Sequence, residues 1–263
     1  MSRFVLGGKI PSLSLSVSKW SAWAPGVTDL PGWQSWAKGD LAISGTVDPD
    51  VKFVAPMMRR RLSSLSRMAF RVAADCLEEE TDSPRFVFCS RYGEYARSYG
   101  ILESVAAGNP ASAAAFSMSV HNTATSLFSI ETKDRSASTA LAGGEATLET
   151  GFLEAWSLLV NRAATSVLLI YHDEQLPGLY QGEKTTVAHD GAIAMLLRLP
   201  DDAAGEICLN LEWTTRGSTD EPPQDTIADP AMEVLKLLIN GAGSFVLDTD
   251  RLVWTWKAGH GAD

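Results

Sequence analysis

Apolar residues in this chain follow strand spacing and helical spacing in alternation. Leu13–Val17 alternates between apolar and polar residues, as a half-buried strand does. Met57–Leu77 instead places apolar residues on one face of a helix, which predicts a long amphipathic helix. Arg85–Cys89 is a short apolar run typical of a strand, and Tyr95–Ala107 is predicted to be a helix that ends before Gly-Asn-Pro.

The stretch over residues 117–155 has three predicted parts. Helical spacing over Asn122–Ile130 indicates a helix, with Asn122 and Thr123 as the candidates for its N-terminal cap. Ser136–Ala140 has the small and β-branched residues of a buried strand, and Gly143-Gly144 then opens a second helix. A strand that turns through glycine onto a helix N-terminus is the geometry with which enzymes present a nucleophile.

The rest of the chain continues with strands and one helix. Thr165–Tyr171 is a continuous apolar run, as expected for a strand buried on both faces. Because helices and strands alternate over residues 57–171, we predict an α/β fold with a largely parallel sheet and helices on both faces. The remaining expected elements are strands at Ala192–Leu199 and Ile207–Trp213 joined by a turn at 200–202, a surface loop at Thr214–Ala228, a helix at Met232–Leu238 and a strand at Leu252–Trp256.

Composition and charge narrow the function classes. The net charge of −10 argues against a nucleic-acid-binding role, because binding phosphates requires a basic face. Three cysteines without a CxxC pair are expected to be buried free thiols in a reducing compartment. The N-terminus lacks the apolar core of a signal peptide, and no run reaches the ~18–20 apolar residues of a membrane span. We therefore expect a cytoplasmic protein without a membrane span.

Two clusters suggest binding surfaces. Arg59, Arg60 and Arg61 form the most basic region of this acidic chain. They indicate either contact with an acidic partner or a solvated helix face. Four tryptophans follow the first strand in what we expect to be a loop. They either cap the core, which we favour, or line a ligand groove or partner surface; they are Trp20, Trp23, Trp33 and Trp36.

Residue patterns of known catalytic sites are mostly missing. The sequence has no HExxH, GxSxG, GxGxxG after a strand, or Walker lysine motif, so no metal and no cofactor are expected. Polar residues at 172–174 directly follow a predicted strand, and His189-Asp190 comes further on in a polar loop. We favour loop polarity and strand termination over an acid–base or metal site. Cys89 and Thr139 remain as possible nucleophiles, with His121 or His172 as a base.

The central stretch resembles the ketoacyl synthases, in the N-terminal half of their thiolase-like fold. In that family an Asn-initiated interface helix leads to a strand and then to a Thr-Ala-Cys-x-x-Gly elbow. Thr139-Ala140-Leu141-Ala142-Gly143-Gly144 matches this elbow. Three further stretches resemble the short ketoacyl-synthase-like chain length factors of aryl polyene and related pigment polyketide systems; these are RRRLSSLSRM at 59–68, SRYGE at 90–94 and FSMSVHN at 116–122.

Two departures from the family imply a chain without its own catalysis. Leu141 occupies the position of the nucleophilic cysteine, and an aliphatic side chain cannot form an acyl thioester. The C-terminal half of the family, which carries two catalytic histidines, does not fit into 263 residues. We expect one ketoacyl-synthase-like N-terminal domain over 1–263, with a C-terminal extension from about residue 200.

The resemblance then implies a heterodimer with a catalytically competent ketoacyl synthase, whose acyl tunnel this chain shapes. An acyl carrier protein would take part indirectly, through the synthase, and Arg59–Arg61 are expected to contact it or the partner. The alternatives are a stand-alone acyltransferase or thioesterase that uses Cys89 or Thr139, and a purely structural assembly subunit. Expected interface and tunnel residues are Met118, His121, Asn122, Thr123, Ala124 and Phe128.

Overall fold

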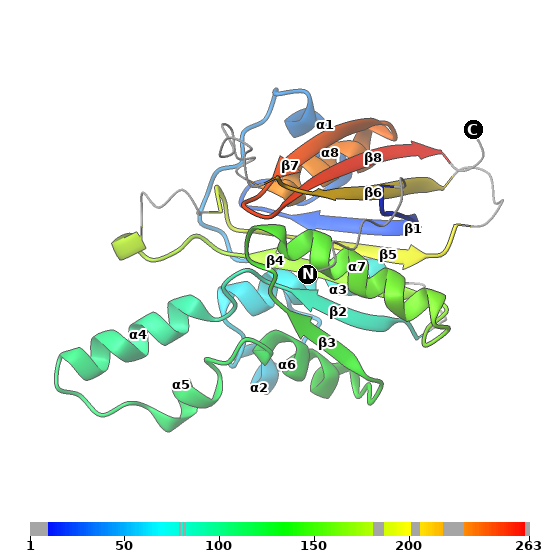
Figure 1. Ribbon diagram of the computed structural model, residues 1–263. Helices are drawn as coiled ribbons and strands as arrows, with labels where there is room; N and C mark the ends of the chain where they lie inside the picture. Colours follow the sequence, from blue (N-terminus) through cyan, green and yellow to red (C-terminus); the bar gives the residue numbers. More distant parts are fainter. Residues whose placement is uncertain are drawn as a thin grey trace, which may run out of the picture.

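One continuous mixed sheet runs through the molecule (Figure 1). The computed structural model describes residues 10–78, 80, 83–180, 187–200, 206–217 and 229–260. Within these residues eight strands are arranged in the order β3-β2-β4-β5-β1-β6-β8-β7. Their bounds are β1 Ser12–Trp23, β2 Arg85–Cys89, β3 Ser138–Leu141, β4 Val167–Asp173, β5 Gly191–Arg198, β6 Ile207–Thr215, β7 Gly243–Asp248 and β8 Leu252–His260.

The predicted α/β class is confirmed, but the prediction of a largely parallel sheet is wrong. Only β2 pairs in parallel, with β3 on one side and β4 on the other, and every other described pairing is antiparallel. Parallel neighbours need a long crossover, and helices supply it between β2, β3 and β4. The described part of the β4–β5 connection holds only a 3₁₀ turn, η2 (Gly178–Tyr180), so β5 returns antiparallel.

Helices cover both faces of the sheet, as the pattern predicts. On one face lie α3 (Ser64–Leu77) and α6 (Thr123–Thr132), and on the other lie α7 (Thr147–Val160) and α8 (Pro230–Asn240). Strand β4 contributes to both hydrophobic cores, because Leu168 and Ile170 face the α3 side, whereas its alternate residues face α7. The remaining helices are α1 (Leu30–Ala37), α2 (Pro56–Arg59), α4 (Tyr95–Ala106), α5 (Ala113–Ser117) and the 3₁₀ turn η1 (Gly144–Ala146).

The single helix predicted over residues 57–77 is two helices. α2 ends at Arg59, and α3 begins only after Ser63, whose hydroxyl accepts a hydrogen bond from the Ser66 amide at 3.0 Å. This serine cap satisfies one of the amide groups that a helix N-terminus leaves free, so a new helix starts here. The apolar face predicted for α3 is confirmed, since Leu65, Met68 and the residues that follow at helical spacing are buried.

Other predicted elements differ in extent or in neighbours. β1 continues to Trp23, so two tryptophans of the expected loop lie on a strand, and the predicted buried strand is the half-exposed edge strand β3. β5 and β6 are not neighbours, because β1 lies between them. β7 was missed. Most of the turn at 200–202 and of the loop at 214–228 lies outside the described residues.

In the described part of the chain, no helix has the length and apolarity that crossing a membrane requires.

A buried carboxyl group joins α7 to the C-terminal strands. Glu149 is fully buried, and its Oε1 accepts a hydrogen bond of 2.8 Å from Trp256 Nε1, while Oε2 has no partner among the described residues. Burial raises the pKa of Glu149 to about 7. The ring of Trp256 also packs on Phe152 of α7, with 4.8 Å between the ring centroids. Through Trp256, strand β8 therefore packs on helix α7.

We predict that Glu149→Gln weakens the pH dependence of stability. Folding raises the pKa of Glu149, so the folded state binds this proton more tightly than the unfolded state does. The resulting contribution to folding stability is complete below the ordinary pKa of 4.5 and is lost as pH rises through about 7. Between pH 5 and 8 the wild type should lose up to about 3 kcal/mol more than the variant. Urea unfolding at four pH values measures this difference, with the exposed Glu78→Gln as control. Equal pH slopes in wild type and Glu149→Gln would contradict the prediction.

Candidate functional site

The predicted strand–turn–helix elbow is present. β3 ends at Leu141, whose carbonyl oxygen accepts a hydrogen bond of 3.2 Å from the Ser90 amide. Gly144 then takes a φ of +63°, and η1 leads into α7. At Gly143 an added Cβ would lie 2.4 Å from Thr150 Oγ1, so only glycine fits this turn. The backbone of the elbow therefore has the predicted strand, glycine turn and helix start.

The side chains at the elbow offer little reactivity. Leu141 is half-buried and packs against the core on the α7 side of the sheet. Thr139 donates a 3.0 Å hydrogen bond from Oγ1 to Glu154 Oε1, and no described histidine is bonded to either group. Cys89 is fully buried, and burial raises the pKa of its thiol well above the ordinary value. Cys89 is thus a neutral thiol within the core. Cys76 and Cys208 are free and buried as well.

A turn at the end of β2 is held by the buried carboxylate of Asp173. Ser90 Oγ donates to Asp173 Oδ1 at 2.7 Å, and the Arg91 amide donates to both carboxylate oxygens at 3.0 Å. Burial raises the pKa of Asp173, and these hydrogen bonds act in the opposite direction. Gly93 closes the turn with a φ of +58°, and an added Cβ there would lie 2.8 Å from His121 Cδ2. Glycine therefore lets His121 pack on the turn.

A second buried carboxylate, Glu94, joins this turn to α3. Its Oε1 accepts hydrogen bonds from the hydroxyls of Ser63 at 2.7 Å and Ser66 at 2.8 Å. Its Oε2 accepts one of 3.1 Å from Arg97 Nε. His121 Nε2 in turn donates to the Ser90 carbonyl oxygen at 2.8 Å. The three stretches at 59–68, 90–94 and 116–122, far apart in sequence, thus meet in one hydrogen-bonded network.

Sequence reasoning did not predict this network. Its members are serines, carboxylates and a histidine without periodic spacing, and all of them except Asp173 lie in the quoted family motifs. We call Ser63, Ser66, Ser90, Glu94, His121 and Asp173 the turn network.

Of the polar residues predicted to follow the strand at 165–171, His172 and Asp173 belong to β4 itself and Glu174 comes directly after it. His172 is 2% exposed, and burial lowers its pKa to about 4, so the ring is neutral. Burial raises the pKa of Glu174 to about 7. Asp190 accepts a 2.7 Å hydrogen bond from the Gln175 amide, as a loop residue does. Among the described residues no group of three or more His, Cys, Asp or Glu side chains is arranged to hold a metal ion.

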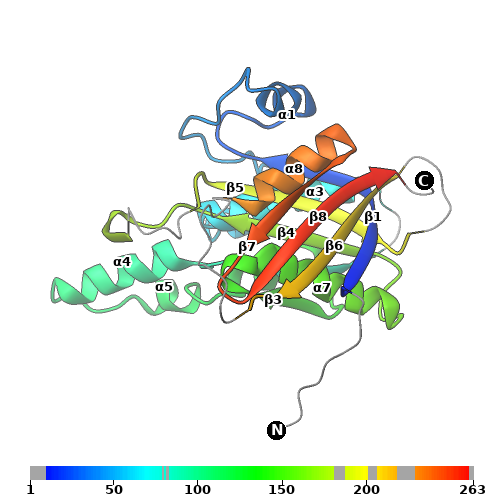
Figure 2. The same cartoon turned by 45° about the horizontal axis from the view of Figure 1, so that its top comes forward.

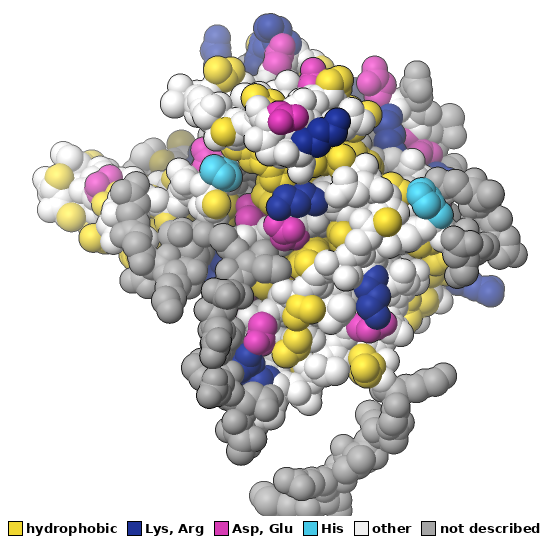
Figure 3. Space-filling view, turned by 90° about the horizontal axis from the view of Figure 1, so that it is seen from above, with side chains coloured by type: hydrophobic (Ala, Val, Ile, Leu, Met, Phe, Trp, Pro, Cys, Tyr) yellow, Lys and Arg dark blue, Asp and Glu magenta, His cyan; other side chains and the backbone are white. Residues whose placement is uncertain are grey.

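Helices α4 and α5 project from the body of the molecule (Figures 1 and 2). We call residues 95–118 the arm. None of the residues of α4 or α5 is buried. Leu102 is 64% exposed, Val105 52% and Phe116 66%. In the view from above, charged side chains of both signs are scattered over the body and its hydrophobic side chains form small separate groups (Figure 3). The arm thus presents large apolar side chains that are more than half exposed.

Helix α6 has an inward and an outward face. Thr123, Ala124 and Phe128 are buried, and the Phe128 ring lies 5.1 Å from that of Phe70. The outward face carries Asn122, Ser126 and Ile130, of which Ile130 is 61% exposed. Met118 and His121 are half-buried where the arm joins α6. The predicted site residues therefore divide into a core set and a surface set.

The three consecutive arginines lie beside the root of the arm. The Arg61 carbonyl oxygen accepts a 3.2 Å hydrogen bond from Arg97 Nη2 of α4. Arg60 and Arg61 are exposed, and Arg59 is half-buried. No ion pair of their guanidinium groups with a described residue is formed, although Arg67, Arg71 and Arg97 all form one.

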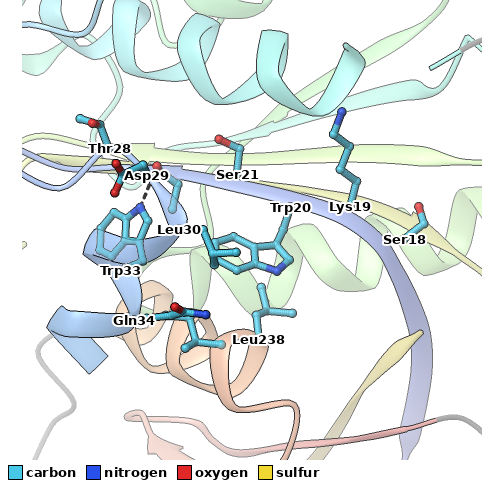
Figure 4. A pocket seen from close by; sticks show the side chains of 12 residues that line it. Ser18, Lys19, Trp20, Ser21, Thr28, Asp29, Leu30, Trp33, Gln34 and Leu238 are labelled. Atoms are coloured by element: carbon cyan, nitrogen blue, oxygen red, sulfur yellow. Dashed lines mark hydrogen bonds between the residues drawn. The ribbon is translucent and has the colours of Figure 1, made fainter. Parts of the chain in front are cut away.

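Two of the four tryptophans cap the core, which is the role that we favour from the sequence, and two border a cavity. Trp23 and Trp33 are buried, and Trp33 Nε1 donates to the Ala22 carbonyl oxygen at 3.0 Å, so these two cap the core. Trp20 and Trp33 border a cavity of about 450 Å³ between β1, α1 and α8. Figure 4 shows both indoles on the same side of β1 as Leu238, whereas Lys19 points to the other side.

Comparison with known proteins identifies the family. The profile of the beta-ketoacyl synthase N-terminal domain matches residues 33–257. No curated protein sequence matches the chain. One similar solved structure is the ketosynthase ApeO in complex with its chain length factor ApeC from Xenorhabdus doucetiae. The match has a TM-score of 0.73 and 26% identity, and covers 93% of this chain and 99% of the other.

Two further structures show the same fold at low identity. The ishigamide ketosynthase/chain length factor matches with a TM-score of 0.73 and 13% identity, over 95% of this chain and 100% of the other. Ketosynthase twelve of the bacillaene synthase from Bacillus amyloliquefaciens matches with a TM-score of 0.55 and 12% identity, over 79% of this chain but 46% of the other. The fold is therefore the thiolase-like fold of ketosynthases, and the chain belongs to the beta-ketoacyl synthase N-terminal domain family.

Proposed function

We propose that this chain is a non-catalytic chain length factor that pairs with a ketoacyl synthase and shapes its acyl tunnel. The observation that carries the proposal is the exposed apolar surface of the arm, together with the edge strand β3. The likeness to chains of equal length in two ketosynthase/chain length factor structures supports it. We infer a product of the aryl polyene type or a related polyketide from the stretches at 59–68, 90–94 and 116–122.

The elbow supports a role without catalysis. Enzymes lower activation barriers by about 8–23 kcal/mol, and covalent acyl transfer needs a nucleophile that a base can activate. Leu141 stands at the end of β3, where the family carries its cysteine, and Cys89 is buried. Thr139 is the one hydroxyl of the elbow with a carboxylate partner. The competing function is a stand-alone acyltransferase. In that case Thr139, bonded to Glu154, would have to act as the nucleophile.

Three features form the proposed partner surface. The arm exposes large apolar side chains, and such patches on soluble proteins mark contact sites. The outward face of α6 carries small and apolar residues that allow a second helix to pack closely. β3 is a half-exposed edge strand whose outer backbone groups are free to pair with a strand of the synthase. Together they would extend one sheet across both subunits.

We assign the expected site residues within this surface. Met118, His121 and Asn122 lie where the arm meets α6, and we propose that they face the partner and its tunnel. We propose an indirect role for the buried residues of α6. Their packing in the core sets the position of the helix; they are Thr123, Ala124 and Phe128. The exposed Arg60 and Arg61, with Arg59, are proposed to contact the acidic carrier protein or the synthase.

We further propose that residues 1–263 form a single unit. The strands of the expected C-terminal extension, β6, β8 and β7, continue the same sheet beyond β1.

The first prediction concerns the arm. We expect the chain to co-elute with the neighbouring synthase in equal amounts when both are produced together and one carries a tag. Changing Leu102 and Phe116 to Asp should weaken the complex at least tenfold, because each buried apolar side chain contributes about 1.5–3 kcal/mol. Val246→Asp, at an exposed site on β7, is the matched control. A stable chain that never captures the synthase, or equal binding by both variants, would remove the proposal.

The second prediction concerns the elbow. Leu141→Ala and Leu141→Ser should leave the assembled pair active, because Leu141 packs against the core and forms no covalent intermediate. The rate of product formation by the purified pair measures this, with gel filtration to confirm that the complex is intact. Complete loss of activity in an intact complex, or an acyl adduct on this chain by intact mass spectrometry, would show that the elbow reacts.

A further inference from the structure

A second cavity lies on the α3 side of the sheet. It has a volume of about 600 Å³ and lies between α3, the C-terminal end of α6 and the loop before α2, within the 300–1,000 Å³ usual for ligand pockets. We call it the α3–α6 groove. Its apolar walls come from all three segments and consist of Phe53, Phe70, Ala74, Leu77 and Phe128.

Contacts within the chain hold the walls of the groove in place. Phe70 and Phe128 are 0% and 3% exposed and pack edge to face. Phe53 is 51% exposed, and the Arg71 guanidinium lies 5.6 Å from its ring centroid. The Ala55 amide donates a 2.8 Å hydrogen bond to Glu131 Oε1, which ties the Phe53 loop to α6. The groove thus has a rigid floor and one half-exposed aromatic wall.

Three of the charged groups at the rim, Arg71, Asp75 and Glu131, have partners within the chain, and the fourth, Glu78, is exposed at the open side of the groove. Arg71 forms an ion pair with Asp75, and Asp75 also accepts a 3.0 Å hydrogen bond from the Ser21 hydroxyl. Glu131 is bonded to the loop as described. A polar ligand group placed on the floor would find no hydrogen-bonding partner there and would lose its hydration at a cost. The groove is therefore suited to a hydrocarbon.

The groove also adjoins the proposed partner surface. Helix α6 lines it with Phe128, Glu131 and Thr132, while Asn122, Ser126 and Ile130 on the same helix face outward. An α-helix with side chains is about 10–12 Å wide, so the two surfaces lie one helix diameter apart. A chain that passes along the synthase interface reaches the groove around the C-terminal end of α6.

We infer that the α3–α6 groove receives the apolar, unreactive end of the acyl chain that grows on the partner synthase. This inference rests on the proposed function and assigns a specific subsite to it. A protein segment is a poorer occupant, because a standard interface takes about 20–30 residues on each side and ten residues line this groove. The length of the groove then limits how far the chain can extend.

Ala74→Phe tests the inference by filling the groove. Ala74 is half-buried on the groove face of α3, so the larger ring occupies the cavity. The opposite change is Phe53→Ala, which widens the groove at its exposed wall. Ala163→Phe places the same ring on an exposed turn after α7, on the other side of the sheet, and serves as the matched control.

Two measurements are made on each variant. Titration of the isolated chain with cis-parinaric acid, a fluorescent polyene fatty acid, should show one saturable site. Its affinity should fall at least tenfold in Ala74→Phe and stay unchanged in Ala163→Phe. In the assembled pair, Ala74→Phe should shorten the products and Phe53→Ala should lengthen them by at least one two-carbon unit.

The outcomes separate this inference from the proposed function. Intact complexes with unchanged product length in both groove variants would overturn the inference and leave the chain length factor role standing. Absence of any complex would overturn the proposed function, and the fatty-acid titration would still decide the groove. Equal binding of the probe by wild type and Ala74→Phe, or weaker synthase binding by Ala74→Phe alone, would mean that a protein segment or nothing occupies it.

Discussion

The hydrogen bonds that Asp173 and Glu94 accept inside the protein hold its functional parts together. A buried carboxylate is costly unless its oxygens are paired, so the turn over residues 90–94 has one conformation. From this turn, His121 fixes the end of the arm and Ser90 fixes the end of β3. The arm and the elbow, separate in sequence, therefore share one anchor. Any movement of the turn would displace both.

On the function proposed above, this common anchor accounts for an elbow that keeps its backbone geometry without a cysteine. Its glycines, its link to Ser90 and the start of α7 position β3. β3 is an edge strand of the described sheet, and we propose that this edge meets the partner. A change of the reactive side chain to leucine leaves all of these contacts in place, because they are made by the backbone. The catalytic group can be lost while the geometry remains necessary for assembly.

The sequence predicted the elements whose signal is local. α4, α6, β4 and the glycine elbow are confirmed, since periodicity, a breaker or a glycine pair marks each one. The direction of β5, the position of β1 between β5 and β6, and the edge strand β7 were not predictable, because strand pairing depends on distant segments. The turn network was not predictable either, because its residues come from segments that are far apart in the sequence. For Phe128, spacing indicated a helix but not which neighbours its ring would meet.

The C-terminal strands show how a chain of about half the length of ketosynthase twelve completes its core. α7 follows the elbow and presents Leu148, Phe152 and Ala155, which must be covered for the elbow to be stable. Trp254 and Trp256 of β8 and Leu247 of β7 pack in the same core cluster. Trp256 also satisfies one oxygen of Glu149. The short C-terminal hairpin thus buries the elbow helix from within the chain, and the arm and β3 are the surfaces that we propose meet the partner.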